Sequence, residues 1–304
     1  MISFKQLRYA LAVARTLHFK KAAEQCAISQ SALSTAIAEL ESQLGVQLFE
    51  RDNKKVLLTP VGEQILARAT AISLEIDDIY RLATVAREPL SFPMTMGVIP
   101  TIGPYLLPKV LPAVRREYPD FRLTIAEEQS HVLVDKVRSG ELDTAVLALP
   151  YAHEGLLEFP FWDENLVVVT HRDNPQQLPS PVRAADLREA RLMLLKDGHC
   201  LRDHALAACH LQASSLDETL EGASLYTLIQ MVAGHMGSTL VPEMALDQLL
   251  SDSSELTAIP LEEPGPHRSI AFLARPNFGG VSNIMSLRVL FRKALMAHAA
   301  SMPG

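Results

Sequence analysis

The stretch FKKAAEQCAISQSALSTAIAELESQLGVQLFERDNKKVLLTPVG, residues 19–62, predicts the fold of the N-terminal part of the chain. A short helix precedes a turn at residues 27–28, and Ser29 then occupies the N-cap position of a longer helix. The apolar residues of that helix recur at steps of four, three and four, and Gly45 ends it. Because another helix begins at Phe4, the pattern indicates a helix-turn-helix.

Small or hydrogen-bonding side chains occupy the face of the longer helix opposite its apolar residues. They are Gln30, Ser31, Ser34 and Thr35. Side chains of this kind can approach base edges in the major groove of DNA. The alternative is an ordinary solvated helix face, because helix-turn-helix patterns also arise by chance.

The segment after this helix predicts a basic β-wing. Residues 46–49 and 56–58 are expected to form two short strands around Arg51, Lys54 and Lys55. These cations would contact phosphates or the minor groove and supply affinity that depends on salt. Together the helix and wing favour double-stranded DNA as a partner.

The net charge of -7 over 304 residues is divided unevenly along the chain. Residues 1–60 contain eight Lys or Arg and five Asp or Glu, so they carry +3 and leave -10 for the remainder. Positive charge is therefore concentrated where DNA contact is expected. No apolar run is long enough to cross a membrane and the N-terminus lacks a secretory signal, so we expect a cytoplasmic protein.

Residues 59–88 predict a long helix that pairs with a second copy of the chain. Thr59 and Pro60 suit its N-cap and first position. A narrow apolar seam follows at alternating steps of four and three, formed by Ile65, Ala69, Ile72, Ile76, Ile79 and Ala83. The alternative is that this seam packs against its own domain.

The remainder of the chain alternates short apolar runs with helical segments. The runs are Thr95–Ile99, Leu123–Ala126, Thr144–Leu149, Leu166–Thr170 and Leu192–Leu195. This alternation favours parallel α/β sheets.

The segment KDGHCLRDHALAACHL, residues 196–211, contains two of the three cysteines. Cys200 precedes a helical run and has His199 and Arg202 beside it in sequence, and all three features stabilise a thiolate. Cys209 is nine positions further on, which is about 13 Å of rise in a continuous helix. Since a disulfide needs Cα atoms within about 7 Å, the two cysteines can bond only if the helix unwinds or moves.

Two other interpretations of the cysteines stay open. A buried cysteine is often only a small apolar residue, which is how we interpret Cys26. Zinc binding would use a cluster of His199, Cys200, His204, Cys209 and His210, but the spacing matches no common zinc module. We therefore expect no metal and no cofactor.

Residues 19–62 resemble the helix-turn-helix and wing of LysR-type transcriptional regulators. The resemblance implies that Gln30, Ser31 and Ser34 face bases and that Arg51 enters the minor groove. It implies an α+β multidomain fold with a winged helix-turn-helix, a long linker helix and an α/β regulatory domain like that of periplasmic binding proteins. The expected boundaries are 1–58, 59–88 and 89–304, with regulatory subdomain I at about 89–163 and 268–304 and subdomain II at about 164–267.

The cysteine segment, with GVIPTIGPYLLP at 97–108 and LVPEMALDQL at 240–249, resembles the peroxide-responsive members of that family. This resemblance implies that Cys200 is oxidised first, to a sulfenic acid, and that Cys209 then forms a disulfide with it. It also implies a set of peroxide-positioning or thiolate-activating residues, namely Thr101, Ser130, His199 and Arg268, to which the sequence argument adds Arg202. At Ser130 the family has threonine, so this chain keeps the hydroxyl and lacks the methyl group.

The expected function is that of a transcriptional regulator that senses hydrogen peroxide and is not an enzyme. Expected partners are DNA, further copies of the chain as a dimer or tetramer, RNA polymerase and a thiol-disulfide reductant. One alternative is a regulator with a small organic effector in the cleft between subdomains and incidental cysteines. Another is a thiol peroxidase with a DNA-binding appendage.

Overall fold

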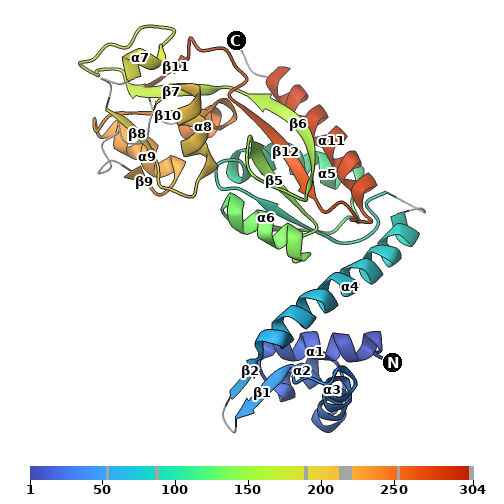
Figure 1. Cartoon of the computed structure of the whole chain (residues 1–304). Helices are drawn as coiled ribbons and strands as arrows, with labels where there is room; N and C mark the ends of the chain where they lie inside the picture. The colour runs from blue at the N-terminus through green and yellow to red at the C-terminus, as the bar shows by residue number, and fades with distance from the viewer. Residues whose placement is uncertain (53–54, 86–88, 188–190, 212–220, 252–253, 301–304) are drawn as a thin grey trace. The chain divides into compact units, whose positions relative to one another are not determined.

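A computed structural model describes residues 1–52, 55–85, 89–187, 191–211, 221–251 and 254–300 (Figure 1). The chain divides into two compact units, residues 1–82 and 83–304. Each unit has its own cluster of buried apolar side chains. Among the described residues, no helix has both the length and the hydropathy needed to cross a bilayer.

The first unit is a three-helix cluster with a two-stranded sheet and the start of a long helix. Its elements are α1 (Phe4–Thr16), α2 (Phe19–Gln25), α3 (Gln30–Leu44), β1 (Phe49–Asp52), β2 (Lys55–Leu58) and α4 (Pro60–Val85). Both predicted ends of α3 are confirmed. The Ser29 hydroxyl accepts the N–H of Ala32 at 3.2 Å, and Gly45 ends the helix with φ at +69°.

The first wing strand begins at Phe49, three residues later than the predicted start at Val46. The reason is a carboxylate from α3. Glu41 accepts the backbone N–H of Leu48 at 2.8 Å and that of Phe49 at 3.2 Å. Since these donors are bound to α3 and Leu48 is buried, the segment before Phe49 connects the helix to the wing and does not pair with β2.

Helix α4 changes its surroundings along its length. At its start, Thr59 Oγ1 accepts the N–H of Gly62 at 2.9 Å, and Leu66 and Ala69 are buried in the core of the first unit. Exposed apolar side chains follow, at Ile72 (46%), Ile79 (64%) and Leu82 (58%). The first turns of α4 therefore pack against their own unit, as the alternative interpretation of the seam expected. The later turns present an exposed apolar face.

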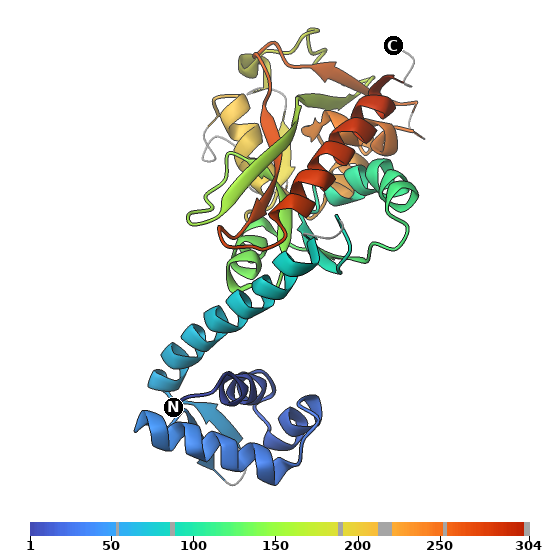
Figure 2. The same cartoon turned by 90° about the vertical axis from the view of Figure 1, so that its right-hand side faces the viewer.

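The first sheet of the second unit has the strand order β4-β3-β5-β12-β6. Its strands are β3 (Met94–Val98), β4 (Leu123–Glu127), β5 (Thr144–Leu149), β6 (Leu157–Glu164) and β12 (Arg268–Ala274). Its helices are α5 (Gly103–Glu117), α6 (Ser130–Ser139) and α11 (Val281–Ala300). Figures 1 and 2 show α11 on one side of this sheet and α6 on the other.

The second sheet has the strand order β11-β7-β10-β8-β9. Its strands are β7 (Leu166–His171), β8 (Leu192–Leu195), β9 (Glu221–Gly222), β10 (Ser238–Pro242) and β11 (Leu256–Pro260). Its helices are α7 (Ala184–Leu187), α8 (Cys200–Ala208), α9 (Leu225–Ala233), the 3-10 turn Glu243–Ala245 and α10 (Leu246–Leu249). The chain passes from the first sheet to the second at residues 164–166 and returns at residues 260–268.

The prediction of parallel sheets is confirmed for part of each sheet and wrong for the rest. Strands β3, β4 and β5 pair in parallel, as do β8, β9 and β10, but β12 is antiparallel to both of its neighbours and β7 to both of its own. In each sheet the antiparallel strand, β7 or β12, is the first strand after a crossing between the sheets. The five predicted strands are all present, and the sheets also contain β6, β9, β10, β11 and β12.

Candidate redox site

Cys200 is the first residue of α8 and is 4% exposed. The buried strand β8 leads into it through residues 196–199, and a glycine is needed in that loop. Gly198 has φ at +92°, and a Cβ atom there would lie 2.9 Å from the side chain of Gln129. The loop therefore brings Cys200 close to the start of α6, which begins one residue after Gln129.

Burial raises the pKa of the Cys200 thiol above its ordinary value. Three groups act in the opposite direction: the hydroxyl of Ser130, the charge of Arg268 and a backbone hydrogen bond from Ala148. The carboxylate of Asp203 adds to the rise. The effect of burial is the largest, so the net shift of the pKa is upward, while Ser130, Arg268 and Ala148 limit it.

Ser130 is the first residue of α6 and is 1% exposed. Within the described part of the chain its oxygen has no hydrogen-bond partner by geometry, although the hydroxyl lies near enough to Cys200 to lower the pKa of that thiol. A buried hydroxyl without a full set of partners is uncommon, because burial removes its bonds to water. The group is therefore available to a small polar molecule beside the thiol.

The structure brings Arg268 to the site and holds it rigidly. Its guanidinium is fully buried; Nε donates to Glu164 Oε1 at 2.6 Å, and Nη2 pairs with the same oxygen. Nη1 donates to Thr101 Oγ1 at 3.3 Å, and Nη2 donates to the Thr101 carbonyl at 3.2 Å. Glu164 also accepts the N–H of Met244 at 3.3 Å. These bonds connect residues from both sheets beside the cysteine.

Arg202 does not have the predicted role. Its Nη1 donates to the Leu195 carbonyl at 3.2 Å and to Glu221 at 2.5 Å, while Nε lies 3.1 Å from Asp197. It follows Cys200 by two positions, which places it on a different side of the helix. Its charge is thus neutralised away from the thiol, and it is not among the groups that shift the pKa of Cys200.

His199 is the N-cap of α8 and makes no side-chain cap. Partial burial lowers the pKa of its imidazole, so the ring is mainly neutral at neutral pH. With Thr101 it lines a pocket of about 290 Å³, to which Tyr105 and Leu225 also contribute. Thr101 and His199, to which the family resemblance assigns peroxide positioning, therefore line the same pocket, and the His199 ring is mainly uncharged there.

Cys209 lies at the opposite end of α8, as its C-cap, and is 1% exposed. Burial raises the pKa of its thiol to about 12, and the nearby Glu263 carboxylate contributes to the rise. Both cysteines are free thiols separated by the whole length of the helix. Among the described residues, no group of three or more His, Cys, Asp or Glu side chains is placed to hold a metal ion.

His204 is a residue whose role the sequence did not indicate. It is 3% exposed, its Nε2 lies 3.0 Å from the Pro150 carbonyl, and its Nδ1 has no partner among the residues described. It follows Cys200 by four positions, so both side chains lie on the same side of α8. That spacing is the signal from which it could have been identified.

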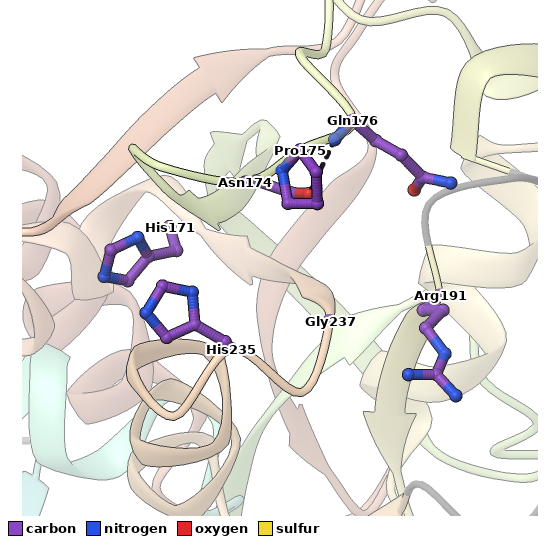
Figure 3. A pocket seen from close by; sticks show the side chains of 7 residues that line it. All are labelled: His171, Asn174, Pro175, Gln176, Arg191, His235 and Gly237. Atoms are coloured by element: carbon purple, nitrogen blue, oxygen red, sulfur yellow. Dashed lines mark hydrogen bonds between the residues drawn. The ribbon is translucent and has the colours of Figure 1, made fainter.

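Among the further pockets of the second unit are the following two. One of about 430 Å³ is lined by Arg268 together with Pro150, Tyr151 and His267. Figure 3 shows the other, of about 220 Å³, where the rings of His171 and His235 lie with centroids 3.8 Å apart and are tilted by 37° to each other. No residue predicted from sequence lines this second pocket.

The predicted DNA-contacting residues occupy α3 and the wing. Gln30, Ser31 and Thr35 are exposed on the first turns of α3, and Ser34 is half-buried. Lys55 is exposed at the start of β2. Lys54 and the side chain of Arg51 lie outside the part of the chain that the structure describes.

Comparisons with known proteins agree with this architecture. Residues 4–63 match the family model "Bacterial regulatory helix-turn-helix protein, lysR family", and residues 88–280 match "LysR substrate binding domain". The regulator EstR of Acinetobacter baylyi is 39% identical, and the hydrogen peroxide-inducible genes activator of Dickeya chrysanthemi is 37% identical, each over 90% of both chains. Full-length OxyR from Pseudomonas aeruginosa, solved as a cysteine-to-aspartate variant, superposes with a TM-score of 0.78 at 35% identity, covering 96% of this chain and 98% of that one.

The matched family models together span both units, and the similarity to OxyR extends over nearly the whole length of both proteins. The chain therefore belongs to the LysR family of DNA-binding transcriptional regulators and is similar to its OxyR members.

Proposed function

We propose that this regulator senses hydrogen peroxide in the cytoplasm through a reversible disulfide between Cys200 and Cys209. The observation that carries the proposal is the surroundings of Cys200. A buried thiol at a helix N-terminus contacts a hydroxyl with spare hydrogen-bonding capacity, from Ser130, close to the buried guanidinium of Arg268. A second buried thiol, Cys209, ends the same helix.

The proposed chemistry has two balanced steps. The Cys200 thiolate attacks one peroxide oxygen, the O–O bond breaks, and a sulfenic acid and hydroxide form. The Cys209 thiol then displaces hydroxide from that sulfur, giving the disulfide and water. A thiol-disulfide reductant later returns both thiols.

The groups around Cys200 suit the first step. Ser130 and Arg268 both favour the thiolate, and donors aimed at a developing negative charge also stabilise a departing hydroxide. Thr101 is bonded to the same guanidinium and would fix its orientation. His199 and Thr101 line a pocket beside this network, which offers a route for peroxide.

The second step requires a change of structure. Helix α8 spans Cys200–Ala208, so the cysteines are about 13 Å apart along its axis. A disulfide needs Cα atoms about 4.4–6.8 Å apart. Oxidation must therefore unwind or displace α8, and this remodelling is the signal that the regulatory unit would transmit.

DNA recognition is assigned to the first unit. Gln30, Ser31, Ser34 and Thr35 of α3 would read bases, while Arg51, Lys54 and Lys55 of the wing would contact the backbone or minor groove. The exposed apolar face of α4 supports pairing of two copies through this helix. A tetramer and contact with RNA polymerase are proposed from the family alone.

A second candidate is a regulator that binds a small organic effector. It is favoured by the pocket of about 290 Å³. Tyr105 lines this pocket from α5, a helix of the first sheet, and Leu225 lines it from α9, a helix of the second sheet. EstR, whose name does not refer to peroxide, is 39% identical to this chain, which is similar to the 37% identity of the hydrogen peroxide-inducible genes activator. In this case both cysteines would be incidental.

The decisive experiment counts thiols by mass spectrometry after one equivalent of hydrogen peroxide. We expect a linked 200–209 pair in the wild type, a sulfenic acid on Cys200 in Cys209→Ser, and no oxidation in Cys200→Ser. Cys26→Ser is the matched control and should behave as the wild type. If all thiols stay free, the redox proposal is wrong and the effector hypothesis remains. Sustained peroxide turnover with a reductant would indicate a peroxidase.

Replacing Ser130 with alanine should slow sulfenic acid formation about tenfold at pH 7. Its hydroxyl is the largest influence that lowers the pKa of Cys200, so its loss leaves less thiolate, and a hydrogen bond to a charged group is worth about 1.5–3 kcal/mol. Stopped-flow kinetics in a Cys209→Ser background would measure the rate. Ser130→Thr should keep most of it, and the exposed Ser139→Ala should keep all of it; equal rates for Ser130→Ala and wild type would exclude the hydroxyl from the reaction.

A further inference from the structure

Helix α8 is attached on two sides. On one side, Arg202 bonds to the Leu195 carbonyl at the end of β8 and to Glu221 of β9, both in the helix's own sheet. On the other side, His204 Nε2 contacts the carbonyl of Pro150 at 3.0 Å, directly after β5 of the other sheet. Figure 1 shows α8 beside its own sheet with β5 nearby.

The His204 contact has a defined chemical form. A carbonyl oxygen can only accept, so Nε2 must carry the proton and Nδ1 must present its lone pair. Burial lowers the pKa of this imidazole, which keeps it neutral. Within the described residues Nδ1 has no partner, so the Pro150 bond is the only hydrogen bond that fixes the ring.

We propose that His204 is a positioning residue that attaches α8 to the end of β5 and thereby controls how fast oxidised Cys200 can reach Cys209. This inference rests on the proposed disulfide. Cys200 and His204 are one helical turn apart on the same side of α8, and both face residues of β5 or the segment after it. Cys200 cannot travel along the helix axis to Cys209 while that turn stays bound to Pro150.

The attachment acts on the second chemical step only. Peroxide meets Cys200 in the intact site, so loss of the His204 bond leaves the groups at the sulfur in place: Ser130, Ala148 and Arg268. Condensation of the sulfenic acid with Cys209, which releases water, needs α8 to detach first. His204 therefore lengthens the life of the sulfenic acid and holds the reduced conformation.

Two variants of similar size distinguish the loss of the hydrogen bond to Pro150 from the loss of the imidazole ring. His204→Leu removes the donor, whereas His204→Gln keeps an N–H that can reach the carbonyl but has no titratable nitrogen. The rate of disulfide formation is measured once the sulfenic acid has formed. We expect this rate to be about fivefold higher in His204→Leu and within about twofold of wild type in His204→Gln. In a Cys209→Ser background the peroxide step should stay within about twofold for both.

Hydrogen exchange on the reduced full-length protein tests the attachment without peroxide. Backbone amides of α8 should exchange about fivefold faster in His204→Leu and at wild-type rates in His204→Gln. If His204→Leu fails to fold, as judged by the emission of Trp162, His204→Met takes its place. Unchanged exchange and unchanged disulfide rates in the leucine variant would overturn the inference.

Other results also decide the question. If peroxide reaction slows in both variants while α8 exchange is unchanged, His204 acts on the thiol as a base and the attachment role is wrong. If wild-type protein forms no disulfide, the proposed function fails, and the exchange rates still show whether His204 holds α8.

Discussion

Replacing Glu164 with glutamine is expected to lower the free energy of unfolding of the second unit by about 3–5 kcal/mol. Glu164 is the counter-ion of Arg268, and both side chains are almost completely buried, at 1% and 0% exposed. The neutral amide would leave a buried guanidinium without compensation, and desolvating an unpaired charge is costly. The melting temperature of this unit should fall by about 10 °C.

Trp162 makes this measurement specific. It is the only tryptophan of the chain and lies two residues before Glu164, so its emission reports on the second unit alone. Glu141→Gln is the matched control, because it breaks the pair of the exposed Glu141 carboxylate with Lys136 and should leave the unfolding curve nearly unchanged. A double variant, Glu164→Leu with Arg268→Met, should be more stable than Glu164→Gln. Equal unfolding curves for Glu164→Gln and wild type would show that the pair carries no such energy.

The second large effect is expected at alkaline pH and depends on Cys209. Burial raises its pKa to about 12 in the folded state, above the ordinary value of 9.0. Below pH 9 both states keep the proton and nothing changes. Above it the unfolded state ionises first, so stability falls with rising pH up to the folded pKa. Between pH 9 and 11 wild type should lose about 2 kcal/mol more than Cys209→Ala.

Urea unfolding under reducing conditions, followed by Trp162 emission, would measure this loss. Other groups with a raised pKa, such as Tyr105 at about 12, are common to both proteins and cancel in the comparison. Cys26→Ala removes a half-buried thiol from the other unit and should retain the wild-type pH dependence. Parallel stability profiles for wild type and Cys209→Ala would contradict the buried, protonated thiol.

The first unit could be predicted almost completely from the sequence, because its signals are local. The cap at Ser29, the stop at Gly45 and the cap at Thr59 each depend on residues within one helical turn. The start of β1 could not be predicted, since it depends on Glu41 binding backbone donors seven and eight residues away.

The sheets of the second unit were harder to predict. Strand β6 contains Pro160 and has no regular alternation of buried and exposed residues, so it gives no clear period-two pattern. Strand β12 is buried on both faces for most of its length, and such a run is easily confused with a core helix. Their antiparallel pairing joins residues more than 100 positions apart, which no local pattern records.

At the candidate site, residue types were easier to predict than contacts. Both cysteines lie at the expected ends of a helix, but Arg202 binds Glu221 and not the thiol. Arg268 bonds to Thr101, 167 positions away in sequence. The family resemblance assigned both residues to one site, whereas their spacing in the sequence could not. The effect of burial on the pKa of Cys200 was missed because burial is a property of the folded core.

The position of β12 between β5 and β6 also has a consequence for biosynthesis. Residues 94–164 leave the ribosome early, yet their sheet lacks an internal strand until residues 268–274 have been made. The sheet built from residues 166–260 has all its strands before that point. The later sequence therefore finishes folding first, and a nascent chain stopped near residue 265 would present the unpaired edges of β5 and β6 to chaperones and proteases.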